Sequence, residues 1–227
     1  MLEGIKIEVY RANQELAKNG LVTLRWGNIS ARDEHTGYVV IKPRRIAYTK
    51  IAPHDLIVCD MEGRIIEGAA TPSSDLLTHL EIYKAFPQVM SVAHTHSKWA
   101  TVFAQAGMSI PNLGTTHADY FRCDIPITRT MSPEEIAVDY EKNTGRIMAD
   151  AFSGQERDPM ATPAILVRNH GPFVWGRDIA HTVDNAVALE YVAEMAFHTL
   201  RLNTDADMNK YLIEKHVQRK QERSNEQ

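Results

Sequence analysis

The segment VMSVAHTH, residues 89–96, joins an apolar run to two histidines that are separated by a single residue. Residues two apart in an extended chain point to the same side, so His94 and His96 can place both imidazoles on one face of a strand end. A second apolar run, AILV at residues 164–167, is followed by His170. Three imidazoles at two strand ends predict a metal site, and three protein ligands with an open position are typical of catalytic zinc. Histidines that only form hydrogen bonds near the surface are the alternative interpretation.

The composition indicates a soluble globular protein, with 44% hydrophobic and 24% charged residues. A net charge of -4 gives no basic footprint for nucleic acid. Cys59 and Cys123 are too few for a disulfide framework and are expected to pack as small apolar residues in a reducing compartment. The N-terminus has no secretory pattern, and no apolar stretch approaches the roughly 20 residues of a membrane helix. We therefore expect a cytoplasmic protein without membrane or nucleic-acid partners.

Hydrophobic periodicity predicts strands in the middle of the chain and helices before, between and after them. The apolar stripe that begins at Leu2 predicts a helix ending at Asn19-Gly20. Strands are expected at 21–31, 38–42, 56–60, 64–67, 89–93 and 164–168, and further helices at 72–87, 97–106, 132–152, 178–202 and 206–220. Residues 114–120 lie between prolines and are expected to form an irregular loop. This order predicts one α/β domain over residues 1–227, with a mixed or antiparallel central sheet flanked by helices.

The sequence PSSD at residues 72–75 opens a helix and offers several groups to a ligand. The hydroxyls of Ser73 and Ser74, together with free backbone N–H groups, can form an anion site, or they can simply cap the helix. Asp75 is a fourth candidate metal ligand, or it only favours the positive end of the helix. Both interpretations remain open for each residue.

A second polar group lies at the end of the strand expected at 38–42, where Lys42, Arg44 and Arg45 bring three cations together. Arginine suits bidentate binding of an oxyanion, whereas a solvated basic turn is the plainer alternative. Gly27-Asn28 can bring the backbone close to a ligand or can mark a bulge.

The segment GTTHADY at residues 114–120 is dense in polar groups, and loops on rigid scaffolds often hold catalytic residues. Asp119 could serve there as a proton acceptor or donor. Glu141 is expected in the middle of a helix, where a glutamate usually lies on the solvent-exposed face. His216 lies near the end of the last helix, where it can offset the negative helix end.

These pieces together resemble the class II aldolase family and, within it, the L-ribulose-5-phosphate 4-epimerases. The resemblance extends from the first helix to about Lys220. The matching segments are 21–23, 26–28, 41–43, 72–75, 94–97, 114–121, 170–173, 175–176 and 215–216.

The resemblance implies an α/β fold of that type and a fourfold cyclic homotetramer with active sites at subunit interfaces. It implies a divalent metal, usually Zn²⁺ with Mn²⁺ or Co²⁺ as alternatives, held by His94, His96, His170 and Asp75. It implies a sugar-phosphate substrate, with its phosphate held by Asn28, Lys42, Ser73 and Ser74. Around the reacting sugar it implies Thr115, Asp119, Glu141 and His216, with Asp119 as one of two acid/base groups.

The implied activity is that of an isomerase of arabinose catabolism and pentose phosphate metabolism. It inverts carbon 4 of L-ribulose 5-phosphate and gives D-xylulose 5-phosphate. Because that carbon has no acidic proton, a retro-aldol cut between carbons 3 and 4, followed by re-addition, is the expected route. A non-catalytic scaffold of the same fold is disfavoured because the metal-ligand set is present in full.

Two features depart from the epimerase pattern. Arg44 and Arg45 stand where such enzymes have Ser-Gly in the phosphate loop, so that either a guanidinium binds the anion or the substrate differs. Residues 221–227, expected to be mobile or to reach a neighbouring subunit, lack the tyrosine that acts as the second acid/base. The alternative function is therefore a class II aldolase or a decarboxylase of another phosphorylated or acidic sugar derivative.

Overall fold

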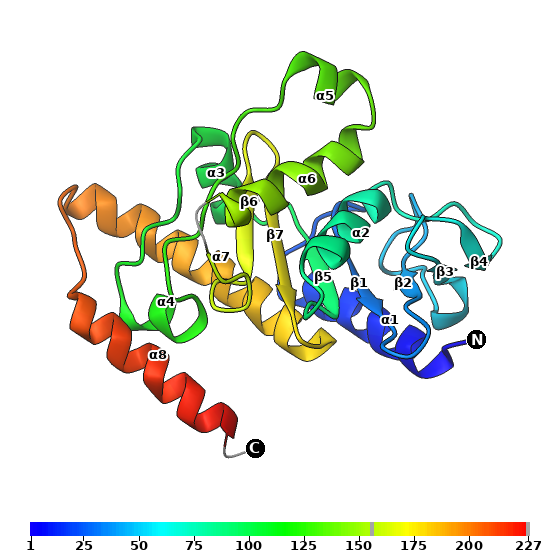
Figure 1. The fold of residues 1–227 in the computed structure, drawn as a ribbon, viewed down its shortest axis with the longest axis horizontal. Coiled ribbons are helices and arrows are strands. Elements are labelled where there is room, and N and C mark those ends of the chain that lie inside the picture. Colours follow the sequence, from blue (N-terminus) through cyan, green and yellow to red (C-terminus); the bar gives the residue numbers. More distant parts are fainter. Residues whose placement is uncertain (155–156, 226–227) are drawn as a thin grey trace.

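The computed structural model describes residues 1–154 and 157–225 and is built on one seven-stranded antiparallel sheet. Its strand order is β4-β3-β2-β1-β5-β7-β6 (Figure 1). The strands are β1 (Asn28–Arg32), β2 (Val39–Ile41), β3 (Ile57–Cys59), β4 (Ile65–Glu67), β5 (Ser91–His94), β6 (Ala164–Val167) and β7 (Gly171–Gly176). The α/β class and the helix-flanked central sheet predicted from the sequence are confirmed, and every strand pair is antiparallel.

Helices cover both faces of this sheet. They are α1 (Glu3–Lys18), α2 (Leu76–Ala85), α3 (Lys98–Ala106), α4 (Thr115–Tyr120), α5 (Pro133–Ala137), α6 (Tyr140–Ser153), α7 (Ile179–Leu202) and α8 (Lys210–Asn225), with a 3₁₀ turn at Pro53–Asp55. In β5, Ala93 packs with α1, α3 and α7, whereas Val92 packs with α2 and α6 on the other face. This alternation follows from the two-residue period of a strand and produces a three-layer arrangement.

Three predicted element boundaries are wrong because backbone geometry overrides periodicity. The strand expected from residue 21 begins only at Asn28, since Leu24 and Gly27 adopt φ 58° and φ 80° in the turn before it. The helix expected over 132–152 is divided into α5 and α6, since Asp139 adopts φ 54°. The last helix begins at Lys210, not near residue 206, and continues to Asn225.

Two further elements were not predicted. Residues 115–120 form the short helix α4 where an irregular loop was expected. Strand β7 was not predicted, because a glycine followed by a proline usually ends a strand. In the structure, Pro172 nevertheless pairs with Leu166 in the ladder with β6. Residues 221–225, part of the predicted tail, continue α8, and residues 226–227 lie outside the described residues. No described helix has the length and apolar character needed to cross a membrane.

Candidate metal centre

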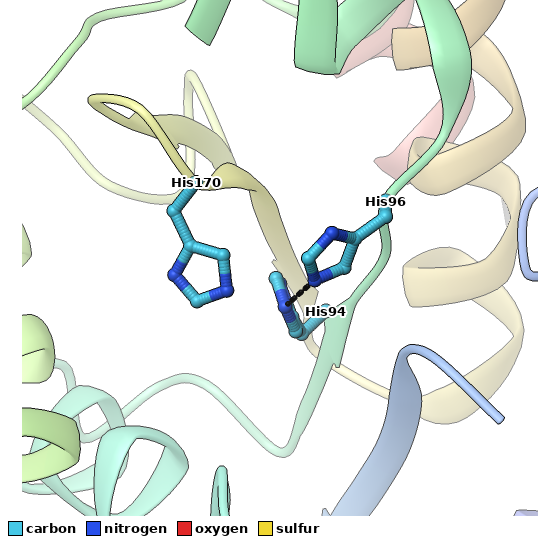
Figure 2. Close-up of side chains that lie close together, drawn as sticks. All are labelled: His94, His96 and His170. Atoms are coloured by element: carbon cyan, nitrogen blue, oxygen red, sulfur yellow. Dashed lines mark hydrogen bonds between the residues drawn. The ribbon is translucent and has the colours of Figure 1, made fainter. Parts of the chain in front are cut away.

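Three histidines from two places in the sheet converge on one point. His94 ends β5, His96 follows two residues later, and His170 lies in the turn between β6 and β7. Figure 2 shows the three rings gathered around a common space. One ligand nitrogen from each ring lies within 4.8 Å of the other two, and the Nε2 atoms of His94 and His96 are 3.1 Å apart. The pairing of β5 with β7 brings these segments together, because it aligns His94 with Phe173.

The His94 ring is held by its surroundings. Its Nδ1 lies 3.0 Å from the carbonyl oxygen of Pro172, and its ring stacks on Phe173 with centroids 4.1 Å apart. A protonated Nδ1 that donates to this carbonyl leaves the Nε2 lone pair free, which is the arrangement of many metal-bound histidines. Because of burial, the pKa of His94 is lowered to about 3, and burial also lowers the pKa values of His96 and His170. The three imidazoles are therefore neutral at pH 7, as metal binding requires.

The donor set fits a divalent transition metal such as zinc. Three neutral imidazoles suit Zn²⁺. Zinc–nitrogen bonds of about 2.1 Å in a tetrahedron separate neighbouring nitrogens by roughly 3.4 Å. The nitrogens here are spread over up to 4.8 Å, so an inward shift on the order of 1 Å would complete the site. Of the three side chains, His96 is exposed and His170 is half-buried.

Asp75, the predicted fourth ligand, lies beside this group but outside the compact set of three histidines. Its Oδ2 accepts a hydrogen bond from Asn28 Nδ2 at 2.6 Å, and Ser73 Oγ lies 3.4 Å away. Burial would raise the pKa of Asp75, but the neighbouring imidazoles of His94 and His79 and the Asn28 amide lower it. The carboxylate is therefore ionised and available to a cation.

These groups line one pocket of about 450 Å³. Its lining residues are Arg25, Trp26, Gly27, Lys42, Arg44, Arg45, Ser73, Ser74, Asp75, His94, His96, Tyr140, Glu141 and His170. All predicted metal-binding residues and all predicted substrate-binding residues except Asn28 are thus brought together. Asn28 is fully buried and contacts both Ser73 and Asp75, and its Oδ1 has no partner among the described residues.

Backbone hydrogen bonds join the basic segment 42–45 to the segment 71–74, which contains Ser73 and Ser74. Ser73 N donates to Lys42 O at 3.0 Å, and Arg44 N donates to Thr71 O at 2.9 Å. Lys42 is only 3% exposed, and its Nζ lies 5.2 Å from the centre of the Tyr48 ring. Burial lowers the pKa of Lys42, and the charge of Asp75 opposes that effect. A buried ammonium that forms no salt bridge within the described part of the chain, with Asp75 acting on it only beyond salt-bridge distance, indicates a site for an anion.

The predicted acid/base residues divide into two groups. Glu141 lines the pocket and lies in the first turn of α6, not in the middle of a helix as expected. Asp119 on α4 and His216 on α8 are hydrogen-bonded, with Oδ1 and Nδ1 2.6 Å apart. Thr115 is the first residue of α4, and none of these last three residues lines the pocket. Figure 1 shows α4 and α8 side by side at the edge of the molecule.

Three pocket residues were missed in the sequence. The hydroxyl of Tyr140 lies 3.4 Å from Nδ1 of His170, and Trp26 lies 6.1 Å from His96 between ring centres. Arg25 precedes Trp26 and lines the same wall. The only sequence signal was the position of Arg25 and Trp26 next to Gly27-Asn28, which had been singled out for its close backbone approach.

Gly27 allows this loop to lie against the histidine-bearing strand. It adopts φ 80°, and a Cβ there would lie 2.6 Å from the carbonyl oxygen of His94. We expect Gly27→Ala to lower the free energy of unfolding by about 3 kcal/mol and to weaken metal binding. The matched control is Gly37→Ala, with φ 72° and nothing within 4 Å of its Cβ, for which about 1 kcal/mol is expected. Urea unfolding of both variants measures the difference, and equal losses would contradict the close approach.

Comparison with known proteins places this geometry in context. Residues 7–197 match the family model described as the class II aldolase and adducin N-terminal domain. Among solved structures, an L-fuculose 1-phosphate aldolase is 21% identical, with 95% of each chain covered and a TM-score of 0.80. YgbL, a putative aldolase/epimerase/decarboxylase from Escherichia coli, is 22% identical over 95% of this chain and 98% of its own, with a TM-score of 0.74. An L-fuculose 1-phosphate aldolase from Glaciozyma antarctica PI12 is 18% identical over 96% and 81%, with a TM-score of 0.77. At these identities the structural similarity establishes the fold.

Proposed function

Since the chain belongs to the class II aldolase and adducin family, we propose that it breaks and re-forms a carbon–carbon bond of a phosphorylated sugar with the help of a divalent metal. The observation that carries the proposal is the union, in one pocket, of three neutral histidines and the buried ammonium of Lys42. Imidazoles suit the metal, and the ammonium suits a phosphate.

In this proposal, His94, His96 and His170 hold the metal, with Asp75 as an added ligand. A divalent cation bound there supplies Lewis-acid stabilisation of the negative charge that develops on the substrate oxygens as the bond breaks. Lys42, Ser73 and Ser74 bind the phosphate, and Asn28 holds Asp75 and Ser73 in position. The retained phosphate keeps the aldehyde fragment in the pocket while the bond is open.

The proton transfers are assigned to the remaining candidates. Asp119, hydrogen-bonded to His216, acts as one of two acid/base groups and removes the proton of the hydroxyl next to the broken bond. The second group, His216 or a water molecule, protonates the re-formed hydroxyl after the fragment has turned. Glu141 in the pocket and Thr115 on α4 position the sugar. Because Thr115, Asp119 and His216 do not line this chain's own pocket, we propose that a neighbouring subunit contributes them in a homotetramer.

Carbon-4 epimerisation of L-ribulose 5-phosphate to D-xylulose 5-phosphate is the form of this chemistry that the epimerase-like motifs favour. The second candidate is an aldolase or decarboxylase of another phosphorylated or acidic sugar derivative. It is favoured by one observation, the arginines that line the phosphate wall.

The proposal is tested with protein stripped by a chelator and reloaded with Zn²⁺, Mn²⁺ or Co²⁺. Each sample is incubated with L-ribulose 5-phosphate, and the products are followed by ¹³C NMR. We expect metal-dependent formation of D-xylulose 5-phosphate. Free glycolaldehyde phosphate and dihydroxyacetone would indicate an aldolase. Absence of any reaction with each metal would contradict the epimerase assignment and shift the search to acidic sugar phosphates, with release of aldehyde or carbon dioxide as the readout.

A further inference from the structure

Three arginine side chains in the pocket have no partner of their own. Arg25, Arg44 and Arg45 are exposed and line the same pocket as the histidines. Among the side chains of residues 1–154 and 157–219, none forms a hydrogen bond, ion pair or ring contact with these guanidinium groups. Three unpaired guanidinium groups that line one pocket indicate a site for an anion that the chain itself does not supply.

The backbone fixes two of these arginines in place. The segment 42–44 runs antiparallel to 71–73 through Arg44 N to Thr71 O, the Pro43–Pro72 bridge and Ser73 N to Lys42 O. Arg45 then adopts φ 63°, a left-handed conformation that favours glycine. This turn keeps Arg45 on the pocket wall instead of continuing the extended segment.

Arg25 comes from a separate turn. The turn is closed by a hydrogen bond from Trp26 N to Thr23 O at 3.0 Å, and it lies against β5 through Gly27. Two unrelated segments thus bring guanidinium groups to the same pocket.

With a divalent metal bound, the positive charge in the pocket would exceed what one phosphate requires. Four cationic side chains, Lys42 and the three arginines, face two carboxylates, Asp75 and Glu141, and a bound divalent metal would add further positive charge. A phosphate on Lys42, Ser73 and Ser74 is served by the buried ammonium and two hydroxyls. It leaves the three guanidinium groups available for a second oxyanion, which they can bind through paired N–H donors.

We propose that Arg25, Arg44 and Arg45 form a second oxyanion subsite, and that the substrate carries a carboxylate or a second phosphate besides its first phosphate. The inference rests on the proposed sugar-phosphate chemistry in the form of its second candidate, and it names the substrate class as a doubly anionic sugar derivative in place of L-ribulose 5-phosphate. A singly phosphorylated ketose would leave this subsite unfilled and would bind more weakly than its acidic counterpart.

The test compares two ligands of similar size by isothermal titration calorimetry on Zn²⁺-loaded protein. Glycerol 3-phosphate carries one anionic group, whereas 3-phosphoglycerate carries a phosphate and a carboxylate. We expect 3-phosphoglycerate to bind at least 10-fold more tightly. The preference for 3-phosphoglycerate should fall several-fold in each of the variants Arg25→Gln, Arg44→Gln and Arg45→Gly. The affinity for glycerol 3-phosphate should change less than twofold.

The variants are chosen so that the protein folds. Glycine accepts the φ of 63° at position 45, and Arg44 keeps its backbone hydrogen bond when its side chain is replaced. Arg11→Gln, which removes an exposed arginine of α1 outside the pocket, is the matched control and should keep the full preference.

Three outcomes would overturn the inference. Equal affinities of the wild type for both ligands would mean that no second subsite exists. If all three variants keep the preference for 3-phosphoglycerate, the carboxylate of this ligand binds the metal and not the arginines. Equal weakening of both ligands would assign the arginines to the single phosphate. Because calorimetry measures binding without turnover, the result for the second subsite can be interpreted even if the proposed catalytic activity is not found.

Discussion

Replacing His96 with alanine is expected to remove both the bound metal and turnover. His96 supplies one of three imidazole nitrogens in the cluster, and two remaining imidazoles would hold a divalent cation much more weakly. We expect less than a tenth of the wild-type metal content after dialysis, measured by elemental mass spectrometry. We expect a loss of kcat/KM on the order of 10³-fold or more, because the metal is asked to stabilise the charge of the breaking bond.

The exposure of His96 makes this variant a clean test. The side chain lies on the surface of the pocket, so its removal should leave the free energy of unfolding of the metal-free protein almost unchanged. His54→Ala is the control, since that side chain is 83% exposed and lies outside the pocket. Full metal content and full turnover in the His96 variant would refute the ligand assignment.

The sequence was most informative where metal-binding residue types occur at the two-residue spacing of a strand. The spacing of His94 and His96 predicted a shared face at a strand end, and their ring nitrogens lie 3.1 Å apart. His170 was predicted to belong to the same site because it follows a second apolar run. The pairing that brings His170 close depends on β7, which the sequence did not predict because Gly171-Pro172 resembles a break. The right site was therefore predicted with one of its supporting strands missing.

Other residues could not be placed because they depend on contacts between distant segments. The approach of Tyr140 to His170 follows from the left-handed turn at Asp139, which a periodic pattern cannot reveal. Only its position beside Gly27-Asn28 separates Arg25 in the sequence from a solvated surface arginine. Its position on the pocket wall depends on how closely Gly27 packs against β5.

The Asp119–His216 pair illustrates a third limit. Both residues were singled out as candidates, and the structure joins them through α4 and α8, yet outside the lining of the pocket. A single chain holds the metal-binding and anion-binding groups in one place and the proposed proton-transfer pair in another. The proposed mechanism therefore needs a neighbouring copy to bring these two halves together.

Replacing Lys42 with methionine is expected to lower kcat/KM by about 10²–10³-fold while leaving the fold at least as stable as the wild type. A buried ammonium that pairs with a substrate phosphate contributes about 3–4 kcal/mol, which gives this factor. Methionine has a similar length and removes a buried charge that forms no salt bridge among the described residues and interacts with Asp75 only at longer range, so folding should not suffer. The weakened phosphate site should also release the aldehyde fragment, detectable by an aldehyde-trapping assay.

Lys6 provides a matched control with the opposite expectation. It is as buried as Lys42, at 2% exposure, but its Nζ lies 2.6 Å from Oε1 of Glu67. Lys6→Met should therefore lower the free energy of unfolding and leave kcat/KM within twofold, because Lys6 lies outside the pocket. Thermal unfolding and steady-state kinetics on both variants separate the two roles. If Lys42→Met lost stability and kept its activity, as expected for Lys6→Met, Lys42 would be a structural residue and the phosphate assignment would be wrong.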